Sequence, residues 1–539
     1  EHRPTASYVR VEGPRITEVG QGEPDPAGLG DAVVVDFGDR TLAPGFIDPH
    51  VHAEILSTAV HAAVGVHGPE CASIEDIIEK LRANIDIADR RGGWLVGDGN
   101  MAQELRLQDG RLPTRADLDR VSTTIPVAVR FGHTTSLNSK ALEAAGLDTG
   151  EARSLLFPGS AVVDLDDAGR PNGLARELFY DLPIPTPTHD ELKDTLKHGM
   201  REAFTRYGVT TVGEIPRTWE ALEAMDDLMA SGALPVRVDA FPRVGTMGPI
   251  DELIARTQTW GEEAASDGLA LVGVKIFADG GLSGNTAATL HPYCVGSRTH
   301  GRMNFGGPVL TSMIRAIFAA GLQPMVHTVG ERAQLAIGEV LDELGAEGAS
   351  PASPLRLEHA GNYLSDPSRM DLWLRKDIEI VPNVTMLYSL GPAMKQYLGE
   401  IGVQRRFPLR TLLERRGRLT VGSDTIGDER GITNPFFGIW CATERRTWSG
   451  EVIDADEALT VEQGLRLHTI WAAEALHRAD SLGSLEAGKL ADIVALDRDP
   501  LATSVDELLK INVDWVMTGG AEAHRREGAR PIQIVEGRP

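Results

Sequence analysis

Apolar runs that end in polar residues recur along most of the chain, and segments of helical periodicity separate several of them. We expect strands at 45–52, 208–215, 234–241, 269–280, 322–328, 355–361, 378–386 and 419–425. Between them, segments such as "WEALEAMDDLMASG" and "ERAQLAIGEVLDELG" repeat apolar residues at helical spacing and end in glycine, which often follows a helix C-terminus. Strands that alternate with helices in this way predict an α/β fold, a (β/α)8 TIM barrel of parallel strands.

The two ends of the chain show a different pattern, in which short β-like pieces alternate with Gly/Pro turns. These pieces lie at 7–43 and 488–537, and they can pair into one small domain. We therefore expect a composite β-sandwich domain from residues 1–44 and 476–539, and a barrel over 45–475. The interval of about 53–200 is too long for one βα loop, which predicts an inserted subdomain or lid after the first strand.

Charge and composition narrow the range of partners. The formal net charge of −25 gives a surface that repels phosphate backbones and anionic membranes, so we expect no nucleic-acid or membrane partner. No apolar run of about 18 residues is present, and none is expected to span a bilayer. Cys71, Cys294 and Cys441 form no disulfide framework or CxxC motif, which favours a reducing compartment and a cytoplasmic location. A removed signal and a homodimer both stay open.

Residues with metal-binding chemistry stand in or at the ends of the predicted barrel strands. His50 and His52 lie one residue apart after the first strand, so their side chains share a face. The other candidates on later strands are Lys275, His327, His359 and Asp424. Because the carboxyl ends of barrel strands meet at one mouth, we expect all of these side chains to converge there.

Imidazole and carboxylate groups suit Zn²⁺, and Fe²⁺, Mn²⁺, Ni²⁺ or Co²⁺ fit similar geometry. A lone buried lysine is costly unless it is neutral or modified, and a neutral Lys275 amine can react with CO2 to give a carbamate that bridges two ions. Asp424 would then be a ligand that also accepts a proton. Taken singly, Lys275 could pair with Asp279, Asp424 could cap a helix, and each histidine could be a core residue.

Several strings resemble the amidohydrolase superfamily, and most closely its family 3 branch, which includes N-substituted formamide deformylases. They are "LAPGFIDPHVH", "VKIFADGGLSGNTAA", "VHTVGERA", "RLEHA", "GSD" and "GSLEAGKLADIVALDRDPL", and the similarity runs from about residue 30 to 520. The resemblance implies the barrel, the composite β-sandwich and the insertion. It also implies a two-ion zinc centre with carboxylated Lys275, and it carries over a set of ligands: His50, His52, Lys275, His327, His359 and Asp424.

Within the insertion, "PVAVRFGHTTSLNSKAL" also resembles that branch. We expect His133 to reach over the mouth as a catalytic group, and Asn138 and Trp94 to contact substrate, although plain structural roles explain them equally well. The predicted function is a metal-dependent hydrolase that cleaves a C–N bond of a small-molecule amide, formamide or cyclic amide through metal-activated hydroxide. The alternatives are a one-metal deaminase, an ester or lactone hydrolase on the same scaffold, and a binding protein without chemistry. The substrate itself depends on loops.

Overall fold

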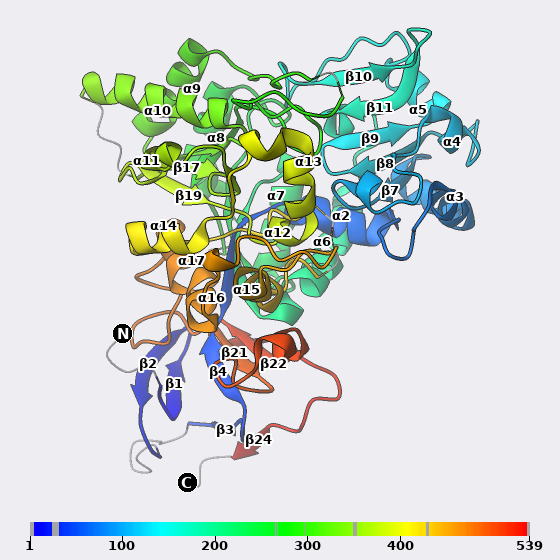
Figure 1. The fold of residues 1–539 in the computed structure, drawn as a ribbon. Helices are drawn as coiled ribbons and strands as arrows, with labels where there is room; N and C mark the ends of the chain where they lie inside the picture. The colour runs from blue at the N-terminus through cyan, green and yellow to red at the C-terminus, as the bar shows by residue number, and fades with distance from the viewer. Residues whose placement is uncertain are drawn as a thin grey trace.

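The structure is a computed structural model, and it describes residues 5–23, 32–264, 266, 268–296, 298–348, 353–426, 429 and 431–535. Figure 1 shows a central α/β region, a β-rich end that contains both termini, and a second β lobe beside the central region. Among the described residues, no helix is both long and apolar enough to cross a membrane.

Two four-stranded parallel sheets form the central region. In sheet order, the first contains β14 (Leu269–Leu271), β13 (Arg237–Ala240), β12 (Val209–Glu214) and β5 (Phe46–Val51). The second contains β15 (Gly273–Phe277), β16 (Gln323–His327), β17 (Leu355–Glu358) and β19 (Ile378–Val381). Almost every residue of these strands is buried, as expected for parallel strands that are covered by helices.

Single backbone hydrogen bonds join the two sheets on both sides. On one side, Lys275 N donates to Pro242 O at 2.9 Å. On the other, Gly422 N donates to Pro382 O at 3.1 Å and Asp424 N donates to His50 O at 2.9 Å. The predicted eighth strand at 419–425 is therefore an irregular segment between the sheets, and the predicted strand at 269–280 is divided into β14 and β15. The result is a TIM-barrel-type α/β arrangement in which individual backbone hydrogen bonds join the two sheets.

Amphipathic helices follow the strands. They include α2 (Ala53–Ala62), α6 (His189–Ala203), α7 (Trp219–Ala230), α8 (Ile250–Glu263), α9 (Gly307–Ala319), α10 (Glu331–Ala346), α13 (Gly391–Gly402), α14 (Leu409–Arg416), α15 (Pro435–Glu444), α16 (Val461–Leu467) and α17 (Ile470–Ala475). The start of α7 is fixed because the Thr218 side chain accepts from Ala221 N, and Gly232 just beyond its end has a φ of 70°. The predicted helices at 219–232 and 331–345 are thus present.

A six-stranded sheet occupies the long interval after β5 and makes the second lobe in Figure 1. Its order is β10 (Val162–Leu165), β11 (Pro171–Arg176), β9 (Thr134–Leu137), β8 (Val127–Phe131), β7 (Leu95–Asp98) and β6 (Val64–Gly65). The helices α3 (Ile74–Ala83), α4 (Arg115–Asp119) and α5 (Ser139–Ala144) complete the lobe. Two separate hydrophobic clusters of its own stabilise it, whereas α2 and α6 pack against each other beside the central region.

Strands from both ends of the chain pair with one another. In one antiparallel sheet, β4 (Thr41–Pro44) lies beside β21 (Ile493–Leu496), which is followed by β22 (Val513–Thr518) and β23 (Ala521–Arg525). The other pairs are β1 (Tyr8–Glu12) with β2 (Arg15–Gly20), and β3 (Val34–Asp36) with β24 (Gln533–Val535). Apolar residues of the N-terminal segments pack on buried Trp515 of β22, and the two ends therefore share one small core.

Candidate metal centre

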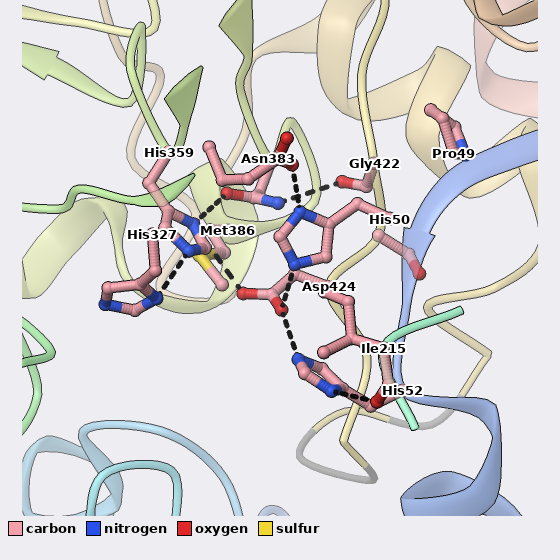
Figure 2. A network of polar contacts seen from close by, with 12 residues as sticks. Pro49, His50, His52, Ile215, His327, His359, Asn383, Met386, Gly422 and Asp424 are labelled. Carbon is pink, nitrogen blue, oxygen red and sulfur yellow. Dashed lines mark hydrogen bonds and ion pairs between the residues drawn. The ribbon is translucent and has the colours of Figure 1, made fainter. Parts of the chain in front are cut away.

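Three of the candidate ligands form a compact buried group at the C-terminal end of β5. Asp424 Oδ1 lies 3.0 Å from His50 Nε2 and 3.2 Å from His52 Nε2, as Figure 2 shows. One ligand atom from each residue lies within 4.8 Å of the other two. Within the described part of the chain, this is the one group of His, Cys, Asp and Glu side chains with that geometry. Two imidazoles and a carboxylate are a donor set that suits Zn²⁺ and similar ions.

Close backbone approach brings Asp424 to the histidines. A Cβ atom on Gly422 would lie 2.4 Å from the His50 Cβ, so only glycine fits at that position. Asp424 has a φ of +51° and His359 a φ of +71°, both in the left-handed region that non-glycine residues seldom adopt. Such conformations cost about 1–3 kcal/mol each and concentrate at functional sites. The backbone is therefore strained where it presents two of the candidate ligands.

One ring nitrogen of each of His50, His52 and His359 has another protein partner. His50 Nδ1 contacts the Glu358 carboxylate, and His52 Nδ1 lies 3.2 Å from Ile215 O. His359 Nδ1 lies 2.7 Å from Asn383 Oδ1. Partners of this kind orient metal-binding imidazoles and leave the opposite nitrogen of each ring for an ion.

A buried arginine supports the Glu358 carboxylate from the same strand. Arg356 Nε donates to Glu358 Oε1 at 2.8 Å, and Arg356 Nη2 donates to Pro49 O at 2.9 Å. Burial raises the pKa of Glu358, but the charges of Arg356 and His50 outweigh burial and hold that pKa below its ordinary value. Glu358 therefore stays ionised beside His50.

Electrostatics at the group favour a cation. Burial raises the pKa of Asp424, but His50 and the hydrogen bonds from both histidines outweigh burial and hold that pKa well below its ordinary value. Burial and Lys275 lower the pKa of His50, whereas Asp424 and Glu358 raise it above its ordinary value. Burial lowers the pKa of His52 to about 4, so that ring is neutral at pH 7, as a ligand must be.

His327 and His359 lie together beside the group but do not join it. His359 Nε2 is 2.8 Å from His327 Nδ1, and the two rings have centroids 4.3 Å apart. His359 Nδ1 lies 3.8 Å from Asp424 Oδ2, and Figure 2 shows the resulting chain of polar contacts. Burial lowers the pKa of His359 to about 3 and that of His327 well below its ordinary value, so both rings are neutral.

Lys275 lies in the middle of β15 and is fully buried. Its Nζ has no hydrogen-bond partner among the described residues and lies 5.0 Å from the centroid of the Phe277 ring. Burial lowers the pKa of Lys275 to about 8. The simpler explanation that Lys275 pairs with Asp279 does not hold, because Asp279 accepts instead from the backbone N–H groups of Ala288, Val329 and Gly330.

His133 is the one insertion residue of the three expected at the mouth that the structure places there. It lines a cavity together with His52, His327 and Asp424, and its Nδ1 lies 2.7 Å from Glu177 Oε2. Burial lowers the pKa of His133, but the charge and hydrogen bond of Glu177 outweigh burial and raise that pKa above its ordinary value. Its ring therefore faces the candidate metal centre with a carboxylate behind it.

Asn138 and Trp94 have structural positions instead. The Asn138 side chain accepts from Val127 N and Ala141 N and donates to Ser122 O and Ile125 O, so its amide is saturated as a helix cap. Trp94 is buried in a hydrophobic cluster of the second lobe. Neither residue lines the cavity at Asp424. The structure gives no support to a substrate contact by either side chain.

Sequence reasoning missed the partners of the candidate ligands. Arg356 and Glu358 are two residues apart on β17, a spacing that places two opposite charges on one face of a strand and that could have marked a buried pair. Glu177 and Asn383 had no comparable local signal, because each meets its histidine only through the fold.

The fold agrees with comparisons to known proteins. The model of the Amidohydrolase family matches residues 33–524. This chain belongs to the amidohydrolase family. The resemblance inferred from its motifs is thereby confirmed, and membership supports a hydrolytic activity.

Among relatives, this amidohydrolase is 27% identical to the N-substituted formamide deformylase of Arthrobacter pascens, over 97% of its own length and 96% of the relative. It is 26% identical to the protein LONG AFTER FAR-RED 3 of Arabidopsis thaliana, over 92% of its length and 84% of that protein. An uncharacterized metal-dependent hydrolase from Pyrococcus horikoshii has a similar fold, with a TM-score of 0.68 at 20% identity, over 92% of this chain and 94% of that one.

Proposed function

We propose that this amidohydrolase is a metal-dependent hydrolase that cleaves the C–N bond of an amide, a formamide or a cyclic amide. The observation that carries the proposal is the buried group of His50, His52 and Asp424, with its ligand atoms within 4.8 Å of one another. The similarity to a formamide deformylase and to a metal-dependent hydrolase supports both the bond type and the ion.

The spacing of the group fits a bound ion. Two ligands at about 2.0–2.1 Å from a tetrahedral zinc ion lie roughly 3.3 Å from each other. The Asp424 oxygen is 3.0 and 3.2 Å from the two imidazole nitrogens, so an ion can enter with little movement. His50, His52 and Asp424 would hold this first ion.

His327, His359 and a modified Lys275 would hold a second ion. The facing nitrogens of the two rings are 2.8 Å apart, and a shift of about half an ångström would give the spacing of two zinc ligands. Lys275 has a buried amine without a hydrogen-bond partner among the described residues, and its lowered pKa makes the neutral, CO2-reactive form accessible. A carbamate there would convert an unpaired amine into a charged bridging ligand.

A divalent ion held by these residues would supply Lewis-acid chemistry, which polarises a carbonyl and lowers the pKa of water. Asp424 supplies the proton transfers that amide cleavage also requires. Its Oδ1 faces the two imidazoles, whereas Oδ2 accepts no hydrogen bond from the described residues. Asp424 can therefore take the proton of the attacking water at Oδ2 and deliver it to the departing nitrogen. His133, held by Glu177, faces the same cavity and would orient the scissile group.

We also propose three structural units for this activity. Residues 45–475 would form the catalytic barrel, with an insertion over about 53–200 that covers the mouth. The two terminal segments, 1–44 and 476–539, would form a β-sandwich. The paired terminal strands and the separate cores of the second lobe support this division.

The test combines metal content with a substrate panel. Protein purified with zinc should retain about two ions per chain, and it should release amine from at least one class among N-formyl amines, acyl amides, lactams and hydantoins. Lys275→Ala should lose one ion and most activity, and a short carboxylate in the buffer should partly restore both. Retention of no ion, with activity that is indifferent to chelators, would overturn the proposal. Retention of both ions by Lys275→Ala, with normal rate, would overturn the bridging role.

A further inference from the structure

A buried arginine beside the candidate metal centre has two guanidinium nitrogens without a hydrogen-bond partner in the described part of the chain. Arg243 follows β13 and is 0% exposed. Its Nε donates to Thr246 Oγ1 at 2.9 Å, but Nη1 and Nη2 have no hydrogen-bond partner among the described residues. It forms no ion pair with any described carboxylate either. Burying a charge in this way costs several kcal/mol unless something pairs with it.

Arg243 lies at the mouth where the proposed chemistry takes place. The next residue, Val244, donates its N–H to Lys275 O at 3.0 Å, so Arg243 lies adjacent to β15. Its side chain lines the same cavity as His52, His327 and Asp424. Aromatic side chains form much of the remaining wall, and the guanidinium carbon is 4.9 Å from the centroid of the Tyr180 ring. Other aromatic residues of that wall are Phe157, Phe179 and Phe277.

The nearby acids do not neutralise Arg243 directly. Glu54 accepts from the backbone N–H groups of Arg217 and Thr218 and from the Thr218 hydroxyl. Glu214 accepts from the backbone N–H groups of Ala53 and Glu54, and burial raises the pKa of Glu214 to about 8. Both carboxylates thus accept from backbone donors, Glu214 at the start of α2 and Glu54 just before α7. Neither pairs with the two Nη groups of Arg243.

We propose that Arg243 binds a carboxylate of the substrate. Two Nη donors on one planar group, without a hydrogen-bond partner among the described residues, match the two oxygens of a carboxylate, which is the geometry that arginine recognises best. The substrate class is then an amide or formamide that carries a carboxylate near the scissile bond and an apolar or aromatic side group against Phe157, Phe179 and Phe277. This assignment rests on the proposed function, since it places the carboxylate in the cavity of Asp424.

The test uses two substrates that differ only by the carboxylate, N-formylphenylalanine in both enantiomers and N-formylphenethylamine. The wild type should favour one enantiomer of the acid in kcat/KM over the neutral analogue by about 10–100-fold, the range of a charged hydrogen-bonded contact. Arg243→Gln should remove that preference and change the neutral substrate only a few-fold. Arg243→Lys, which keeps the charge but not the fork, should give an intermediate ratio.

Arg217→Gln is the matched control, because Arg217 lines the neighbouring cavity with Glu54 and not the cavity of Asp424. It should leave the ratio of kcat/KM between the acid and the neutral analogue unchanged.

A wild type that favours the neutral analogue would overturn the inference. Equal loss on both substrates in Arg243→Gln would also overturn it, and would assign Arg243 to the scissile carbonyl. Loss of bound metal in Arg243→Gln would also overturn the inference, and would assign Arg243 to the metal centre.

Binding of phenylalanine, the expected product, separates this inference from the proposed function. Calorimetry should detect phenylalanine binding to zinc-loaded wild type and at least tenfold weaker binding to Arg243→Gln, with a thermal melt to verify that the variant is folded. If neither formamide is cleaved but this difference is present, the carboxylate site stands and the proposed formamide reaction fails. If both proteins bind phenylalanine equally, or neither binds it, the carboxylate site fails whatever the activity. The wild-type measurements remain decisive if Arg243→Gln does not fold.

Discussion

Asp424 has the most demanding assignment of any single residue, because one carboxylate must hold an ion and also carry a proton. Asp424→Asn keeps one ligand oxygen but cannot accept the proton. We expect the variant to retain at least one ion and to bind substrate, while kcat falls by about 10²–10⁴-fold, the range of a general acid–base group. Metal analysis and steady-state kinetics on the same sample measure both effects. A kcat within a few-fold of wild type would leave Asp424 as a ligand alone.

His468 illustrates a histidine whose burial affects stability rather than catalysis. It is 6% exposed, its Nε2 has no hydrogen-bond partner among the described residues, and burial lowers its pKa to about 4. In the unfolded chain the pKa is about 6.5. The unfolded state therefore binds the proton first, and stability falls as the pH drops below 6.5 until the folded protein also titrates near 4. The difference between the two pKa values corresponds to about 3 kcal/mol in the free energy of unfolding.

We expect His468→Leu to remove this part of the acid lability. Chemical denaturation at pH 7.5 and pH 5 should show a smaller loss of stability in the variant than in the wild type, by about 2 kcal/mol at pH 5. The values at pH 7.5 correct for any packing defect that the leucine introduces, since His468 is neutral there. An identical pH dependence in the two proteins would show that His468 does not contribute.

At the scale of elements, one contact between the second lobe and the barrel mouth joins the residues that flank β9 and β11 to the loop that follows β15. Glu177 lies just beyond β11 and has a φ of +59°. One of its carboxylate oxygens contacts His133, and the other accepts from Gly281 N at 2.8 Å and from the Thr286 hydroxyl. This carboxylate thus connects the inserted sheet to a barrel loop, and it holds His133 over the cavity.

The position of His133 predicts an effect on substrate choice. His133→Ala should change the ratio of kcat/KM between substrates while metal content stays at the wild-type level, because the ring faces the cavity but is not among the candidate ligands. Glu177→Gln, which keeps the size of the carboxylate but not its charge, should shift the ratio in the same direction. An equal decrease on every substrate would indicate a shared catalytic role, and no change in either variant would remove both residues from the site.

At the scale of the whole molecule, the candidate centre links segments from distant parts of the chain. His50, Glu358 and Asp424 belong to β5, β17 and the segment between the two sheets, so an ion bound to His50 and Asp424 would connect these distant segments. The unfolded chain has no such preformed site, and metal binding therefore adds to stability by mass action.

Removal of the metal should consequently lower the apparent melting temperature of the wild type. We expect a decrease of several degrees after dialysis against a chelator and recovery when zinc is restored. In His50→Ala, which lacks a proposed ligand of the first ion, the same treatment should have a smaller effect. A melting temperature that is indifferent to chelation in the wild type, with metal analysis showing removal, would contradict a structural linkage between the ion and the fold.

The local pattern of apolar and polar residues was sufficient to predict much of this architecture. The period of apolar residues predicted the strands and helices of a TIM-barrel-type fold, since burial and helical or strand geometry repeat over short distances. His50 and His52 were predicted to share a face from their spacing alone. Polar residues in or at the ends of apolar strands predicted that Lys275, His327, His359 and Asp424 converge, because the ends of parallel strands meet at one edge.

Tertiary structure decided what each of these side chains touches. His50 meets Glu358 across 308 residues of sequence, and His133 meets Glu177 across 44, so neither pair follows from a local period. The division of candidate ligands into a group of three and a separate pair also required the fold. So did the finding that Asn138 is a saturated cap, whereas Arg243 is buried with two Nη groups that have no hydrogen-bond partner among the described residues. Periodicity determines which face of an element a residue occupies, but its partners depend on how distant elements are placed, and only the folded chain contains that information.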